Sequence, residues 1–176
     1  CGNDFLIVVD LDRALSPTVG EIQTLCGRHG AFGADGLMAI RRGDVAELEM
    51  MLWNADGSLA EMSGNGIRCF AQAAHLAGLL TSPTVTIETG GGIRTATYVE
   101  GATPRLGSAS VAMGKVALLE EVEIAGATFA RRASVGNPHL VIVVDDATAV
   151  DPMIDGPRLS TAPNDGTNVE WISPRS

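Results

Sequence analysis

The residues of this chain best suited to chemistry lie where a polar turn leads into an apolar segment, around residue 63. Ser63-Gly64-Asn65-Gly66 opens a stretch without a helix breaker until Gly78, so we expect a helix that begins at this tetrapeptide. The first N–H groups of a helix lack partners within it and lie at the positive end of its dipole. Glycine at 64 and 66 would let a carboxylate or phosphate approach these amides. The tetrapeptide therefore predicts an anion site, and a helix start capped by Ser63 that binds nothing is the simpler alternative.

Composition narrows the classes of partner. The chain has 176 residues, of which 45% are hydrophobic and 19% charged, which is enough apolar surface for one or two cores. A net charge of −9 without a Lys/Arg cluster argues against nucleic acid and anionic membranes. No apolar run has the length of a membrane span. The odd number of cysteines, without metal-ligand spacing, favours free thiols, no metal site and a reducing, cytoplasmic compartment: Cys1, Cys26 and Cys69.

The elements that must position the tetrapeptide are mostly strands. Short apolar runs between turn residues predict more strands than helices, and hence an α+β fold. Besides the helix near 64–78, we expect one from Ser16-Pro17 to about Gly27. The expected strands are 6–10, 37–40, 47–53, 84–88, 93–99, 108–113, 122–124, 129–135, 140–144 and 168–172. Gly90-Gly91-Gly92 predicts a hairpin.

One pattern occurs twice in the sequence. Gly2-Asn3 precedes an apolar run that ends at Asp10, and Gly136-Asn137 precedes a similar run that ends at Asp145. Such a repeat predicts two similar lobes with a ligand cleft between them. In the second lobe, the counterpart of the Ser63 helix start would fall beyond Ser176, so we expect half of the site to lie outside this sequence.

Several ordered motifs give the chain a resemblance to the diaminopimelate epimerases, within the cofactor-independent amino-acid racemase superfamily. They are Gly2-Asn3-Asp4-Phe5, Gly33-Ala34-Asp35-Gly36, Asn54-Ala55-Asp56-Gly57-Ser58, Gly64-Asn65-Gly66-Ile67-Arg68-Cys69, Gly136-Asn137-Pro138-His139 and Gly166-Thr167-Asn168-Val169-Glu170. The resemblance implies two pseudo-symmetric lobes, each a curved, mostly antiparallel sheet around a central helix. Residues 1–107 would form the first lobe and 108–176 an incomplete second one, in a sequence truncated at both ends.

The resemblance also implies a function: interconversion of LL- and meso-2,6-diaminopimelate by two-base proton transfer, for lysine and peptidoglycan precursors. It implies a small amino-acid substrate, no cofactor, and a homodimer when full length. Substrate-binding residues would be Asn3, Asn54, Gly64, Asn65, Asn137 and Asn168; catalytic residues would be Ser63 and His139. Without the family, the alternative for Asn3, Asn54 and Asn137 is a role as turn formers, and the alternative for His139 is a satisfied core histidine.

Ser63 departs from the family pattern, because the resemblance places a catalytic cysteine at this position. A thiolate costs only about 2 kcal/mol to form at pH 7, whereas a serine hydroxyl needs another group to take its proton. Ser63 is therefore an inactivating change, a working variant, or only a cap. We predict a reduced or altered activity with the carboxylate site preserved.

The alternatives to a diaminopimelate epimerase are a proline or hydroxyproline epimerase or dehydratase, and a catalytically silent amino-acid-binding homologue. Cys69, on another side of the helix, would not replace Ser63, and we expect Cys69 and Cys26 to be buried.

Overall fold

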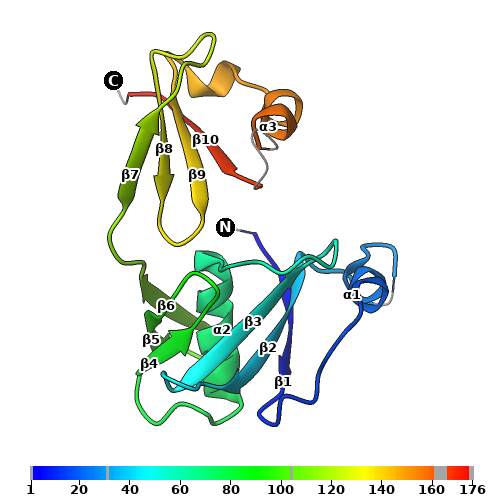
Figure 1. Cartoon of the computed structure of the whole chain (residues 1–176). Coiled ribbons are helices and arrows are strands. Elements are labelled where there is room, and N and C mark those ends of the chain that lie inside the picture. The colour runs from blue at the N-terminus through cyan, green and yellow to red at the C-terminus, as the bar shows by residue number, and fades with distance from the viewer. Residues whose placement is uncertain (1, 31, 104, 161–165, 175–176) are drawn as a thin grey trace. The chain divides into compact units, whose positions relative to one another are not determined.

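The computed structural model describes residues 2–30, 32–103, 105–160 and 166–174. Its elements, shown in Figure 1, are β1 (Phe5–Val9), α1 (Val19–Cys26), β2 (Gly36–Arg42), β3 (Leu48–Asn54), α2 (Gly64–Leu76), β4 (Thr84–Glu88), β5 (Arg94–Glu100), β6 (Gly107–Ala112), β7 (Ala117–Glu121), β8 (Phe129–Ser134), β9 (Pro138–Val143), η1 (Ala147–Ala149), α3 (Pro152–Ser160) and β10 (Asn168–Ile172). The chain divides into two compact units, Cys1–Met113 and Gly114–Ser176. Our predicted boundary after residue 107 differs, because β6 pairs with β5 in the first unit.

The first unit contains a six-stranded sheet in the order β1-β2-β3-β4-β5-β6. The pairs β1–β2 and β3–β4 are parallel, and the other neighbours are antiparallel. Gly90 to Gly92 joins the antiparallel strands β4 and β5, as the sequence predicted. Helix α2 packs mainly on β5 and β6 and touches β1 and β2. The predicted α+β class with mostly antiparallel sheets is confirmed.

Helix α1 starts later than the Ser16-Pro17 pair suggested. Thr18 is its N-cap: the Thr18 hydroxyl accepts from the Glu21 N–H, and the Glu21 carboxylate accepts from the Thr18 N–H. This reciprocal capping box fixes the first helical residue as Val19. Ile22 and Cys26 then enter a core cluster on β2 and β3. The burial of Cys26 agrees with the sequence and raises the pKa of its thiol.

Helix α2 begins at Gly64, with Ser63 as its N-cap. Its buried residues share one side: Gly66, Ile67, Phe70, Ala71 and Ala74. Leu76 is 53% exposed and Arg68 is also exposed. In the described structure only one side of this helix is therefore covered by the sheet.

The second unit contains a four-stranded sheet in the order β10-β9-β8-β7, around a small core of Ala130, Leu140 and Ile142. Helix α3 lies against β10 and was not predicted, because Gly156 and Pro157 within it read as helix breakers. Strand β7 precedes the expected strand at 122–124. The unit has no counterpart of α2 among its described residues.

The repeated sequence pattern has a matching backbone geometry. Gly2 and Gly136 both adopt positive φ, 85° and 106°, which favours glycine. Each leads into a strand that pairs in parallel with the strand after the next helix, β1 with β2 and β9 with β10. The register also corresponds, since Phe5 faces Gly36 and His139 faces Asn168. The two units therefore share a β–α–β arrangement, β1-α1-β2 in the first unit and β9-α3-β10 in the second.

Candidate functional site

Three of the sequence motifs meet at one edge of the first sheet. Strands β1 and β2 start there and β3 ends there, because β2 is parallel to β1 and antiparallel to β3. Backbone hydrogen bonds join the loops: the Asp35 N–H donates to the Asp4 carbonyl at 2.9 Å, and the Ala55 N–H donates to the Asp35 carbonyl at 3.1 Å. The register thus brings together the Asn3 and Asn54 motifs, which lie far apart in the sequence.

At the N-terminus of α2, some of the first N–H groups of the helix donate hydrogen bonds to Ser63. The Ser63 Oγ accepts from the Gly66 N–H at 3.0 Å, and the Ser63 carbonyl accepts from the Ile67 N–H at 2.8 Å. For the N–H groups of Gly64 and Asn65, no acceptor is found among the described residues. Ser63 is therefore the N-cap of α2, and the N–H groups of Gly64 and Asn65 are left for another acceptor.

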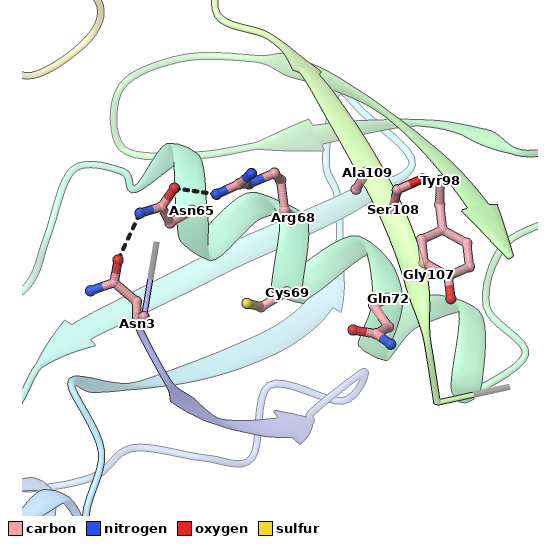
Figure 2. A pocket seen from close by; sticks show the side chains of 10 residues that line it. Asn3, Asn65, Arg68, Cys69, Gln72, Tyr98, Gly107, Ser108 and Ala109 are labelled. Carbon is pink, nitrogen blue, oxygen red and sulfur yellow. Dashed lines mark hydrogen bonds between the residues drawn. The ribbon is translucent and has the colours of Figure 1, made fainter. Parts of the chain in front are cut away.

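A row of hydrogen-bonded side chains connects the Asn3 motif with the first turns of α2 (Figure 2). The Asn65 Nδ2 donates to the Asn3 Oδ1 at 2.7 Å, and the Arg68 Nη2 donates to the Asn65 Oδ1. These three residues line one side of a hollow of about 350 Å³. Its full lining is Gly2, Asn3, Asn65, Arg68, Cys69, Gln72, Tyr98, Gly107, Ser108 and Ala109. Cys69 is therefore half-buried on the wall of a pocket, which corrects the expectation that it is buried.

Asn54 ends β3 in a turn whose side chains bond one another. The Asn54 Nδ2 donates to the Ser58 Oγ at 3.0 Å, and the Asp56 carboxylate accepts from the Ser58 hydroxyl and N–H at 2.6 and 2.8 Å. These hydrogen bonds from Ser58 hold the pKa of Asp56 below its ordinary value. The structure thus gives Asn54 the turn role that we considered as the alternative, at the same sheet edge as Asn3.

The second unit gathers its own polar cluster because β9 and β10 run in parallel. The His139 Nδ1 lies 2.7 Å from a Glu170 carboxylate oxygen, and the His139 Nε2 lies 2.9 Å from the Asn137 Oδ1. A doubly protonated ring donates to both oxygens, whereas a neutral ring needs the Asn137 amide reversed. The Asn168 Nδ2 donates to the Pro138 carbonyl at 3.0 Å. Asn137, His139 and Asn168 are therefore neighbours in the second unit.

Three residues that bond members of these two clusters were not predicted from the sequence as site residues: Arg28, Asp35 and Glu170. Arg28 binds the Asp4 carboxylate through both Nη atoms at 2.7 Å and one Asp35 oxygen at 2.6 Å. Asp35 and Glu170 lie within the motifs that carried the family resemblance, so the signal was present in the sequence. Arg28 lies outside every motif, and no sequence signal pointed to it.

The described residues contain no group of three or more His, Cys, Asp or Glu side chains arranged to hold a metal ion. None of their helices combines the length and the apolar character needed to cross a membrane.

Solved structures of low sequence identity share the fold of this chain. A predicted epimerase from Pseudomonas aeruginosa has a TM-score of 0.61 at 16% identity, over 94% of this chain and 63% of that one. A hydroxyproline epimerase from Agrobacterium vitis, with bound trans-4-hydroxy-L-proline, has a TM-score of 0.56 at 14% identity, over 76% of this chain and 43% of that one. At such identities the likeness concerns the fold, which is that of two-lobed epimerases and racemases.

Sequence comparison identifies the family. The family model of diaminopimelate epimerase matches residues 1–119. The diaminopimelate epimerase of Pelotomaculum thermopropionicum is 35% identical over 97% of this chain and 68% of its own length. That of Parabacteroides distasonis is 39% identical over 97% of this chain and 65% of its own length. The chain belongs to the diaminopimelate epimerase family, a family of isomerases, which confirms the resemblance. It spans about two thirds of the length of these relatives.

Proposed function

We propose that the protein, in full-length form, is an epimerase that interconverts LL- and meso-2,6-diaminopimelate by two-base proton transfer at the α-carbon. Family membership supports the substrate. One structural observation carries the proposal: the N–H groups of Gly64 and Asn65 have no acceptor among the described residues and stand at the positive end of α2. They would bind the substrate's α-carboxylate, with Asn3 and Asn54 at the neighbouring sheet edge.

These amides also suit the chemistry. Removal of the α-proton leaves a carbanion whose charge spreads into the carboxylate, and fixed N–H donors stabilise that charge as it develops. No cofactor is needed for this step. In the second unit, Asn137 and Asn168 would hold the other polar groups of the substrate, and His139 would tune the proton transfer. We further propose a cytoplasmic homodimer that serves lysine and peptidoglycan precursor synthesis.

Ser63 limits the rate in this proposal. Its Oγ already accepts from the Gly66 N–H, and its hydroxyl holds its proton far more tightly than a thiol does. As a cap, Ser63 preserves the helix N-terminus and hence the carboxylate site. As a base, it needs a further group to accept its proton, so we expect slow epimerisation with substrate binding retained.

Deuterium incorporation tests the reaction. The full-length protein, incubated with LL- or meso-diaminopimelate in D₂O, should exchange the α-hydrogen slowly, as followed by NMR or mass spectrometry. Ser63→Cys should raise the rate, because a thiol beside a helix N-terminus ionises readily. Ser63→Ala, which removes the hydroxyl without adding a thiol, is the matched control and should give no gain. An unchanged or lower rate in Ser63→Cys would show that Ser63 does not occupy the base position.

A second function is favoured by the role of Ser63 as a cap: a silent homologue that binds amino acids. Calorimetric binding of diaminopimelate without any α-exchange, also in Ser63→Cys, would support it. A proline or hydroxyproline epimerase or dehydratase is the remaining alternative. The same exchange assay with trans-4-hydroxy-L-proline addresses it, and we expect no exchange with that substrate.

A further inference from the structure

The hydrogen-bonded row that contains Asn3 and Asn65 starts at an ion cluster outside the predicted site. The Asp35 carboxylate accepts from three donors: one oxygen accepts from the Arg28 Nη2 at 2.6 Å, and the other accepts from the Asn3 Nδ2 at 2.9 Å and from the Asp4 N–H at 3.2 Å. The hydrogen bond from Asn3 outweighs partial burial and, together with Arg28, holds the pKa of Asp35 below its ordinary value. At neutral pH this carboxylate therefore only accepts hydrogen bonds.

Both ends of the row have a fixed polarity. Because the Asp35 carboxylate can only accept, Asn3 must turn its NH₂ group toward it, and the Asn3 Oδ1 then faces Asn65. Asn65 must in turn present its NH₂ group, so its Oδ1 faces Arg68, which can only donate. Figure 2 shows this second half of the row. The two amides therefore have a single consistent orientation.

Folding of α1 holds the start of the row in place. Arg28 lies just after Gly27, the C-cap of α1, and α1 is anchored through Ile22 and Cys26 in the core. The N–H of Gly33 donates to the Leu25 carbonyl at 3.2 Å, which closes the loop around Arg28. The packing of α1 on the core therefore places the Arg28 guanidinium beside Asp35.

We propose that Arg28 and Asp35 are positioning residues that fix the orientation of the Asn3 and Asn65 side-chain amides, so that the site offers a bound carboxylate N–H donors. Both amide oxygens are engaged within the row, while each NH₂ group keeps a second hydrogen. A carbonyl oxygen turned toward a carboxylate would repel it. The benefit for binding rests on the proposed function, whereas the fixed amide orientation does not.

Asp35→Asn disturbs this row with almost no change in shape. If the new amide keeps its oxygen toward Arg28, its NH₂ group meets the NH₂ group of Asn3. Asn3 must then reverse, followed by Asn65, and the reversed Asn65 brings its NH₂ group against the guanidinium of Arg68. In that orientation a single exchanged atom perturbs Asn65, with which Asp35 has no direct hydrogen bond.

The first measurement is independent of any activity. In ¹⁵N–¹H spectra of the full-length protein, Asp35→Asn and Arg28→Lys should shift the side-chain NH₂ signals of Asn65. Asp44→Asn is the matched control, because it removes the same negative charge from the surface, where Asp44 pairs with Arg13 at 3.0 Å. Unchanged Asn65 signals in Asp35→Asn, with the fold intact by its backbone amide spectrum, would overturn the proposal.

The second measurement is the dissociation constant for diaminopimelate. We expect about a tenfold increase in Asp35→Asn, a smaller one in Arg28→Lys, and no change in Asp44→Asn. Shifted Asn65 signals with an unchanged dissociation constant would refute the role in binding. If the wild-type protein does not bind diaminopimelate, the proposed function fails, and the Asn65 signals still decide whether Arg28 and Asp35 orient the amides.

Discussion

Two glycines in the first turns of the two helices of the first unit should respond in opposite ways to the same added methyl group. A Cβ at Gly66 of α2 would lie 2.7 Å from the Met38 Cε, 3.0 Å from the Ser63 Cβ and 3.3 Å from the Ser63 Oγ. A Cβ at Gly20 of α1 would meet no atom within 4 Å. Both positions are helical, so alanine should be favoured at each by helix propensity, and only packing separates them.

The magnitudes follow from these distances. Gly20→Ala should stabilise the protein by about 0.5–1 kcal/mol, because alanine loses less backbone entropy than glycine. At Gly66 the same gain is opposed by overpacking that costs about 1–3 kcal/mol. The end of the Met38 side chain can move, but the Ser63 Cβ is held by the cap, so we expect a net loss of about 1–2 kcal/mol.

Urea unfolding measures both changes. Trp53 lies in the first unit and Trp171 in the second, so fluorescence in a Trp171→Phe background reports the first unit. Met38→Leu, which removes the clashing Cε, should reduce the cost of Gly66→Ala by about 0.5–1 kcal/mol in a double-mutant cycle. If Gly66→Ala proved as stable as the wild type, the close packing of the α2 start on β2 would be refuted.

Two further predictions concern buried polar groups. Burial raises the pKa of Asp10, but hydrogen bonds from two backbone N–H groups and from Arg41 outweigh it and leave the pKa below its ordinary value. Since the folded pKa is the lower one, this carboxylate stabilises the fold above about pH 4 and ceases to do so as the pH falls through the folded pKa; urea midpoints at pH 3–6 should fall less steeply in Asp10→Asn, and parallel curves would contradict this. Tyr98 is 4% exposed, and its hydroxyl has no partner among the described residues. Tyr98→Phe should therefore leave the free energy of unfolding unchanged or raise it by up to about 1 kcal/mol, and a clear loss would reveal an unseen partner.

Local patterns in the sequence were enough for most of the secondary structure. Strand β4 and strand β10 have the predicted bounds, and α2 begins at the predicted glycine, because alternating apolar runs and Gly-rich breaks act over a few residues. The same reasoning failed for α3, where a glycine and a proline lie inside a helix that packs on β10. It also placed the boundary between the units too early, since the pairing of β6 with β5 is not visible in β6 itself.

The sequence by itself determined the fold class, the family and the motifs that carry the candidate residues. Only the tertiary structure decided which N–H groups at the start of α2 are consumed by the Ser63 cap and which remain. It also decided that Asn3 forms a hydrogen bond with Asn65, 62 positions away, and that Arg28 forms one with Asp35. The physical reason is that helix and strand signals are short-range, whereas these contacts depend on sheet register and on the docking of α1 and α2, which no local pattern encodes.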